Sequence, residues 1–316
     1  MNRIGCLVLL WATSATAEEP MLIAVPPALH ARSATFEASG IAWAPSLQRY
    51  LIVSDDTGPP GNDHQPWLLA MSKEGVFDDQ VVPIEGIDEL NDGESICKGP
   101  DGLFFLLSSH SPNKKGLVPP ARRRLLLMEL KGRAMKVVGQ ADLSAYVDAK
   151  GRSLLDVAGV AASPATGHLD LEAATYQDRA LYIGMKSPLT ATGTAVILRI
   201  ESPVEALRAG RIPPGALTRS FDVTLRTKHV SQGIADLTRL PDGTWFLVAN
   251  EPKGLAADGG GSLYMVAPKS HTAILLKQFE GLRPEGVTVA EDGKSLIIVF
   301  DMNENPPLWL RWPLKP

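Results

Sequence analysis

The sequence has 316 residues, of which 45% are hydrophobic, and its formal net charge is -4. A mildly acidic chain offers no electrostatic basis for binding nucleic acid or an anionic membrane surface. No stretch approaches the ~20 uncharged apolar residues that span a bilayer, so we expect no membrane insertion.

The first predicted element is a secretory signal peptide over residues 1–17. A short basic start and an apolar run from Ile4 to Trp11 lead to a small-residue cleavage site after Ala17. Cys6 would leave with this segment, and Cys97 would then be the only cysteine, which excludes an intrachain disulfide. We therefore expect a periplasmic or secreted protein.

Five hairpins of similar sequence follow along the chain. Each consists of two short apolar runs joined by a turn, Asp-Gly in several copies, and this pattern is typical of a β-hairpin. Aligned on their turns, the hairpins occupy Ser39–Asp56, Glu94–His110, Leu171–Ser187, Ile234–Glu251 and Arg283–Asp301.

Further strands are expected after each hairpin. Third strands are predicted at Trp67–Met71, Leu125–Leu130, Ala195–Ile200, Ser262–Val266 and Leu308–Trp312. Weaker fourth strands are predicted at Gln80–Ile84, Met135–Val138, Phe221–Leu225 and Ala273–Gln278. Units of four strands that repeat every roughly 50 to 80 residues are typical of a β-propeller.

The last unit lacks a fourth strand of its own. Met21–Val25, or the stretch near Thr35, can supply it, and this would close the ring and remove an exposed sheet edge. We predict an all-β fold with a single β-propeller domain over residues 18–316 and five recognisable four-stranded blades. A sixth blade is the alternative, if the N-terminal segment and an insertion contain a degenerate one. Loop insertions are expected at about 141–168 and 203–215.

Charged side chains recur at two places in the repeat. The start of the first strand and the end of the second strand lie on the same face of an antiparallel blade. First strands line the central channel, so these groups should converge on its mouth. They are Glu94, Glu172, Asp236 and Glu285 at the starts, and Asp55, His110, Lys186, Glu251 and Asp301 at the ends.

Carboxylates that converge in this way point to a metal ion. Neighbouring carboxylates raise one another's pKa, so several carboxylates that lie close together cannot all stay ionised without a counter-charge. Oxygen ligands favour Ca²⁺, or Mg²⁺, as that counter-charge. Glu94, Glu172, Asp236 and Glu285 are the predicted metal ligands. The alternative is that each acid pairs with a basic residue of the next blade and holds the ring together.

Other residues near the mouth are candidates for catalysis and substrate binding. His110 and Asp301 could transfer protons, although a structural role is the alternative for His110. Arg and Lys commonly bind phosphate and carboxylate groups. The predicted anion-binding residues are Lys114, Lys115, Arg122 and Lys186, with a solvated loop as the alternative for the first three.

Short motifs recur in a fixed order along the chain. They are Asp92-Gly93-Glu94-Ser95, Ser109-His110-Ser111, Lys114-Lys115-Gly116 with Arg122–Arg124, Leu171-Glu172-Ala173, Gly184–Pro188, Gly233–Asp236 and Pro284-Glu285-Gly286. In this order they resemble the motifs of a bacterial β-propeller family of uncharacterised function. That family is allied to the propellers with the esterase-like activity of phytase, and more remotely to gluconolactonase- and regucalcin-type lactonases.

This resemblance implies a hydrolase, whereas the converging carboxylates imply only a metal. Together they lead us to expect an exported, metal-dependent hydrolase of an ester, phosphoester or lactone, with a small anionic substrate at the channel mouth. The alternative is a non-catalytic propeller that binds a ligand or protein in the periplasm, because a fold does not imply a function. The sequence specifies no protein partner.

Overall fold

Strands dominate the part of the chain that the structure describes. The computed structural model describes residues 19–33, 35–55, 57–59, 61–62, 64–162, 167–227, 230–251, 260–302 and 306–314. Within these ranges it contains twenty strands and three short α-helices. The predicted signal peptide lies outside the described residues. None of the helices in these ranges has the length and apolar character needed to cross a membrane.

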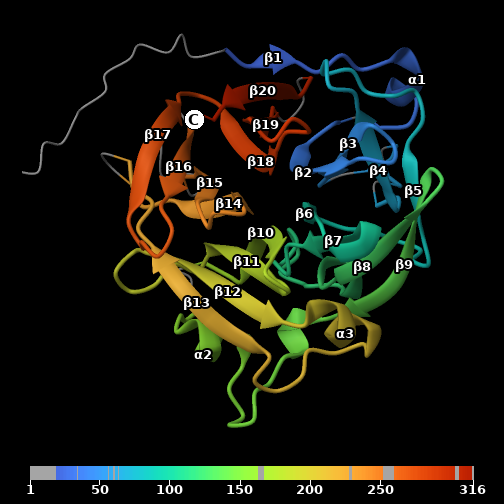
Figure 1. Cartoon of the computed structure of the whole chain (residues 1–316). Coiled ribbons are helices and arrows are strands. Elements are labelled where there is room, and N and C mark those ends of the chain that lie inside the picture. Colours follow the sequence, from blue (N-terminus) through green and yellow to red (C-terminus); the bar gives the residue numbers. More distant parts are fainter. Residues whose placement is uncertain are drawn as a thin grey trace, which may run out of the picture.

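The strands form five groups of four that are arranged in a ring (Figure 1). In each group the first strand lies innermost and the later strands lie progressively outward. The first group contains β2 (Ala38–Ala44), β3 (Arg49–Ser54), β4 (Trp67–Met71) and β5 (Val82–Glu85). The second contains β6 (Gly93–Lys98), β7 (Leu103–Ser108), β8 (Leu125–Lys131) and β9 (Ala134–Ala141).

The third and fourth groups repeat this arrangement. The third contains β10 (Asp170–Gln177), β11 (Ala180–Ser187), β12 (Ala195–Glu201) and β13 (Leu217–Val223). The fourth contains β14 (Gly233–Arg239), β15 (Trp245–Asn250), β16 (Gly261–Val266) and β17 (Ala273–Phe279). The predicted fourth strand Phe221–Leu225 begins four residues earlier than expected, at Leu217.

The fifth group joins the two ends of the chain. It contains β18 (Arg283–Val289), β19 (Ser295–Asp301), β20 (Leu308–Pro313) and the N-terminal β1 (Met21–Leu22). Met21 pairs with Trp309 and Leu22 with Leu308, so β1 is the outer strand beside β20. The predicted β-propeller, closed by its N-terminal strand, is confirmed.

The first two groups are also joined at their outer edges. Ile84 of β5 pairs with Met135 of β9, and Glu85 pairs with Lys136, in parallel register. The two groups therefore form one eight-stranded sheet. This pairing covers two strand edges that would otherwise be open to other chains.

Five apolar clusters fill the spaces between successive groups. In β7, Phe104 and Leu106 belong to the cluster shared with the first group, whereas Phe105 and Leu107 belong to the cluster shared with the third. Successive side chains of a strand point to opposite faces, so a blade packed on both faces needs apolar residues at every position. This requirement explains the unbroken apolar runs in the sequence.

Short helices lie on the outside of the ring (Figure 1). The 141–168 insertion contains α2 (Leu154–Ala158), which contacts β13, and Ser153 and Asp156 form a capping box at its start. The 203–215 insertion contains α3 (Pro203–Arg208), which contacts β8 and β9 of the second group. A third helix, α1 (Pro27–His30), follows β1.

Candidate functional site

A β-bulge lies near the start of every inner strand, at the same place in each repeat. Each bulge is a register shift that leaves one residue of the inner strand without an opposite partner on its neighbour. Such an extra residue bends the strand and re-aims its side chain. The five residues without a partner are Ser39, Glu94, Glu172, Ala235 and Glu285.

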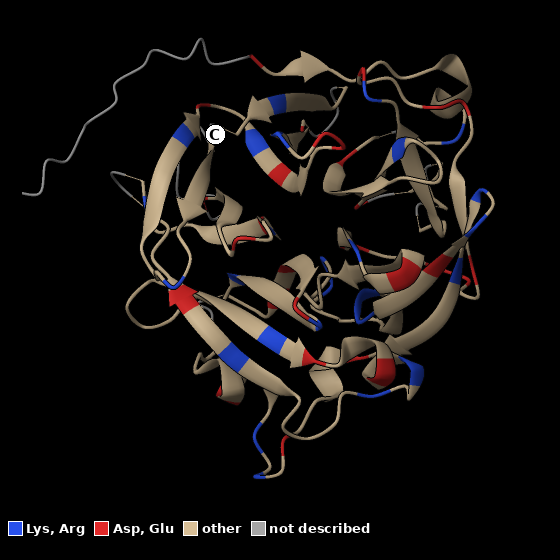
Figure 2. Cartoon of the chain, in the orientation of Figure 1, with Lys and Arg blue, Asp and Glu red and all other residues tan. Residues whose placement is uncertain are grey.

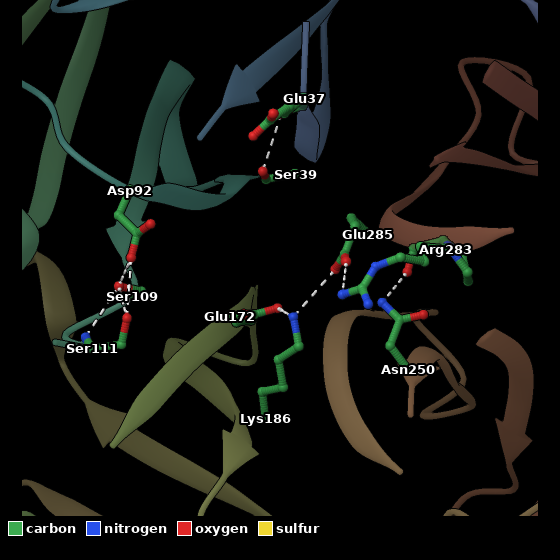
Figure 3. Close-up of polar contacts among 11 residues, drawn as sticks. Glu37, Ser39, Asp92, Ser109, Ser111, Glu172, Lys186, Asn250, Arg283 and Glu285 are labelled. Carbon is green, nitrogen blue, oxygen red and sulfur yellow. Dashed lines mark hydrogen bonds and ion pairs between the residues drawn. The ribbon is translucent and has the colours of Figure 1, made fainter. Parts of the chain in front are cut away.

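Three of these residues are the glutamates that the repeat aligned, and they lie at one mouth of the ring. Figure 3 shows Glu172 and Glu285 from different blades with Lys186 between them. Lys186 Nζ donates to Glu172 Oε2 at 2.5 Å and lies 3.7 Å from Glu285 Oε2. Arg283 Nη2 lies 2.9 Å from the other oxygen of Glu285, Oε1. Both glutamates therefore have basic partners within the protein.

The environment keeps Lys186 charged. Burial alone would lower the pKa of Lys186, but the charges of Glu172 and Glu285 outweigh burial and raise the pKa above its ordinary value. Lys186 was predicted to bind an anionic substrate. In this structure it is part of an ion-pair network that joins the third and fifth groups.

A second acidic cluster lies beside this network. One carboxylate oxygen from each of Asp55, Asp92 and Glu94 lies within 4.8 Å of the others. Asp92 also forms an ion pair with Arg122 and accepts hydrogen bonds from Ser109 and Ser111. Arg122, predicted to bind a substrate anion, is thus already paired with an acid.

Glu94 is the least compensated acid of the mouth. Among the residues that the structure describes, its carboxylate has no hydrogen bond and no ion pair within normal distance. Burial, followed by the charges of Glu172 and Asp92, raises the pKa of Glu94 well above its ordinary value. A cation at this point would offset both the burial of the Glu94 carboxylate and its repulsion by the neighbouring acids.

Acidic groups outnumber basic groups around the mouth. Figure 2 shows red and blue segments around the centre of the ring. The electrostatically coupled acids are Asp55, Asp92, Glu94, Asp170, Glu172, Glu285 and Asp301. The basic side chains among them are Arg122, Lys186 and Arg283. This excess of negative charge favours the binding of a cation.

Asp236, the fourth predicted metal ligand, has a different position. Ala235 occupies the bulge of β14, and Asp236 is one residue further along the strand. Its carboxylate accepts hydrogen bonds from Ser95 Oγ at 3.1 Å and from the Val287 amide at 2.8 Å. Asp236 is 1% exposed, and burial raises its pKa well above the ordinary value. Its contacts are those of a structural group beneath the mouth.

His110, a predicted proton-transfer residue, is also held by the protein. It is 2% exposed, its Nδ1 lies 2.7 Å from the Ser108 carbonyl, and its Nε2 accepts a hydrogen bond from the Leu143 amide. An amide can only donate, so Nε2 is unprotonated and Nδ1 donates to Ser108. Both ring nitrogens are therefore occupied, which corresponds to the structural alternative for His110.

The remaining predicted residues lie near the mouth or on its surface. Asp301 ends β19 directly opposite Arg283, with which it pairs in the sheet register. Lys114 and Lys115 are exposed in a turn after β7, where the Lys115 amide donates to Asn113 Oδ1. Their side chains are therefore accessible to solvent.

The acidic site also contains Asp55, Asp92 and Asp170, which were not predicted as ligands from the sequence, although a pattern marks the last two. Asp92 precedes Glu94 by two residues, and Asp170 precedes Glu172 by two. Arg283 occupies the corresponding place before Glu285. The position two residues before the bulge thus contributes a second ring of charged groups.

Comparisons with known proteins concern the fold. No protein-family model matches the sequence, and no curated protein matches it. An exo-beta-1,3-galactanase from Phanerochaete chrysosporium with galactose aligns with a TM-score of 0.51 and 10% identity, over 94% of this chain and 65% of that chain. This chain therefore spans less than two thirds of the galactanase.

Two further solved structures align with this chain at low identity. An endo-arabinase from Bacteroides thetaiotaomicron aligns with a TM-score of 0.50 and 8% identity, over 93% of this chain and 98% of that chain. A gluconolactonase from Xanthomonas campestris aligns with a TM-score of 0.42 and 13% identity, over 95% of this chain and 96% of that chain. The first of these supports the propeller fold and does not specify an activity.

Proposed function

We propose that this chain is a divalent-cation-dependent hydrolase whose site is the acidic mouth of the propeller. The observation that carries the proposal is the cluster of Asp55, Asp92 and Glu94, in which Glu94 has no hydrogen-bond or ion-pair partner among the described residues. Hard oxygen donors at this spacing suit Ca²⁺ first and Mg²⁺ second. Asp92, with Arg122 and two serines around it, would be the most firmly oriented of the three ligands.

Each group at the mouth has a role in this proposal. A bound divalent cation supplies Lewis acidity and lowers the pKa of a coordinated water. Lys114 and Lys115, which are exposed, would attract the anionic part of a substrate. Asp301, at the end of β19 opposite Arg283, is the proposed proton-transfer residue. His110 is left out, because both of its ring nitrogens are occupied.

The proposed substrate is a small anionic ester, phosphoester or lactone. This class comes from the motif resemblance, and the acidic cluster supports only the cation. The similar solved structures include a galactanase, an arabinase and a gluconolactonase, which are hydrolytic enzymes. Export to the periplasm, predicted from residues 1–17, is part of the proposal.

A non-catalytic binding propeller is the second candidate. The observation that favours it is the internal pairing of the basic groups: Arg122 with Asp92, and Lys186 with Glu172. Basic groups that already pair with acids are less available to stabilise the negative charge of a transition state. A binding protein would need only the cation and the exposed lysines.

Calcium titration and a substrate panel test the proposal. Calcium should raise the melting temperature of the wild-type protein, because a ligand that binds only the folded state stabilises it. Glu94→Gln should weaken calcium binding by about tenfold or more, ~1.4 kcal/mol, and Asp55→Asn should do the same. Glu89→Gln, an exposed change between the same two groups of strands, should leave the shift intact.

The same titration separates two arrangements of ligands. If Glu172 and Glu285 served the same ion as Glu94, their Gln variants would also lose the calcium shift. Because Lys186 and Arg283 already pair with them, we expect Glu172→Gln and Glu285→Gln to retain most of it. An undiminished shift in Glu94→Gln and Asp55→Asn would refute the cation site.

Hydrolysis is then measured with and without a calcium chelator on nitrophenyl esters, nitrophenyl phosphodiesters and simple lactones. Turnover that calcium restores and that Glu94→Gln abolishes would support the enzyme. Calcium binding without turnover on any of these substrates would leave the binding propeller as the function.

A further inference from the structure

A corner in the chain, Ser109-His110-Ser111, follows β7 and is bonded to Asp92. The φ angles of Asp92 and His110 are 58° and 60°, in the left-handed region that residues other than glycine rarely adopt. The Ser109 amide donates to the Asp92 carbonyl at 3.0 Å, and the His110 amide donates to the Arg122 carbonyl at 2.8 Å. The backbone of the corner is therefore fixed to both members of the Asp92–Arg122 ion pair.

Both serine hydroxyls of the corner reach the same carboxylate oxygen of Asp92 (Figure 3). Ser109 Oγ donates to Asp92 Oδ2, and Ser111 Oγ lies 3.2 Å from that atom and 2.9 Å from Ser109 Oγ. Arg122 pairs with the other oxygen, Oδ1. Asp92 is 5% exposed and Ser109 is fully buried, so little water competes for these contacts. Any rotation of the Asp92 carboxylate would break at least one of them.

The His110 side chain anchors the corner to the protein interior. Its Nδ1 donates to the Ser108 carbonyl at 2.7 Å, and its Nε2 accepts from the Leu143 amide at 3.2 Å. Leu143 is fully buried in the apolar cluster between the second and third groups of strands. Among the described residues, these two backbone groups are the hydrogen-bond partners of the ring. His110 can therefore orient Asp92 only through the backbone of the corner and its two serines.

The same corner is joined to the third group of strands. The Ser109 carbonyl accepts a hydrogen bond from the Leu171 amide at 2.7 Å, next to the bulge at Glu172. Buried polar side chains cost free energy of folding that apolar side chains would not, and a left-handed backbone adds strain. Strained backbone of this kind is concentrated where it holds a functional group in place. At this corner the group that is held is the Asp92 carboxylate.

We propose that His110 is a positioning residue of the cation site, which holds the corner so that Ser109 and Ser111 orient Asp92 as a cation ligand. This inference rests on the cation site of the proposed function. Hydrogen-bond partners behind a metal ligand fix its orientation, and their loss typically weakens metal binding by about 10- to 100-fold. His110 thus contributes to affinity without touching the ion or the substrate.

Isothermal titration calorimetry of the full chain with Ca²⁺ tests the proposal, because it measures the affinity of the folded protein directly. Ser111→Ala removes one hydroxyl at a half-buried position and should weaken calcium binding by about tenfold. His110→Ala removes both anchors of the corner and should weaken binding by about tenfold or more. His110→Asn should recover part of that affinity, because its amide can donate to the Ser108 carbonyl and asparagine tolerates a positive φ.

A combined variant shows whether His110 acts through the serines. If it does, its effect on affinity disappears when the two hydroxyls are absent. His110→Ala should therefore weaken calcium binding little further in a chain that already carries Ser109→Ala and Ser111→Ala.

Tyr264→Phe is the control for a general loss of stability. It removes a buried hydrogen bond to Gln232 in the fourth group of strands, at a position with no contact to the corner. This variant should have a lower melting temperature than the wild type and the same calcium affinity.

Equal calcium affinity in Ser111→Ala, His110→Ala and the wild type would overturn the proposal and leave the cation site intact. Fully additive losses in the combined variant would also overturn it, as would an equal loss of affinity in Tyr264→Phe. Absence of calcium binding by the wild-type protein would instead refute the cation site, and this inference with it. If His110→Ala does not fold, wild-type affinity in Ser111→Ala is sufficient to overturn the proposal.

Discussion

Asp236 and Ser95, from inner strands of different blades, are joined by a hydrogen bond of 3.1 Å between the serine hydroxyl and the carboxylate. The Val287 amide donates to the same carboxylate, and the Ala174 amide donates to Ser95 Oγ. Four inner strands, β6, β10, β14 and β18, therefore share one buried polar cluster. If apolar side chains replaced Ser95 and Asp236, the buried amides of Ala174 and Val287 would have no hydrogen-bond acceptor.

We predict that Asp236→Ala lowers the free energy of unfolding by about 2 to 4 kcal/mol, because the Val287 amide and Ser95 lose a buried acceptor. Urea denaturation followed by circular dichroism measures the change. Asp88→Asn, an exposed substitution, is the control and should cost almost nothing. If Asp236→Ala proved as stable as Asp88→Asn, this cluster would not hold the ring together.

A double-mutant cycle tests the pair of Lys186 and Glu172. Removing the ammonium leaves two carboxylates without their shared partner, so Lys186→Met should destabilise the fold by about 3 kcal/mol or more. Glu172→Gln in the same chain should recover part of that loss, because it removes one of the unpaired charges. Additive effects of the two substitutions in urea denaturation would mean that the residues do not interact.

His110 predicts a specific dependence of stability on pH. Burial lowers the pKa of His110 from 6.5 to about 4 in the folded protein. Between pH ~6.5 and ~4 the unfolded chain therefore binds more protons than the folded protein. The contribution of His110 to the free energy of unfolding is fully present above pH ~6.5 and is lost as the pH falls toward ~4. The loss should approach about 3 kcal/mol for this one group.

His110→Gln has no such titration. Its free energy of unfolding should depend less steeply on pH between ~6.5 and ~4 than that of the wild type, even if it is lower at neutral pH. Parallel pH profiles for the two proteins would show that His110 is not the buried neutral group described above.

Gly40 allows a steric test of how closely β2 packs against β6. A Cβ atom on Gly40 would lie 2.6 Å from the Glu94 carbonyl oxygen and 2.7 Å from Ser95 Cα, both of which are backbone atoms. Gly40→Ala should therefore destabilise the protein by about 1 to 3 kcal/mol, as overpacking does. Gly281→Ala provides the comparison, because that site has a φ of 68° but no atom within 4 Å of the added Cβ. A smaller loss for Gly40→Ala than for Gly281→Ala, measured by thermal denaturation, would contradict the close approach of β2 and β6.

Much of the architecture follows from the sequence alone, because strands and turns depend on short-range patterns. Trp67–Met71 was predicted residue for residue as a strand, and the hairpin runs correspond to paired strands. The alignment of Glu94, Glu172 and Glu285 also identified the residues at the bulges, since equivalent positions in a repeat take equivalent backbone geometry.

The tertiary structure decided which charges meet. Glu94 and Glu172 occupy the same position in the repeat, but their neighbours differ. Lys186 lies beside Glu172, whereas Asp55 and Asp92 lie beside Glu94. Asp236 adjoins the same position in the sequence, but one residue of strand register turns its carboxylate to Ser95 instead of the mouth. Repeats determine the local backbone of each blade, whereas electrostatic partners come from different blades and depend on how the ring closes.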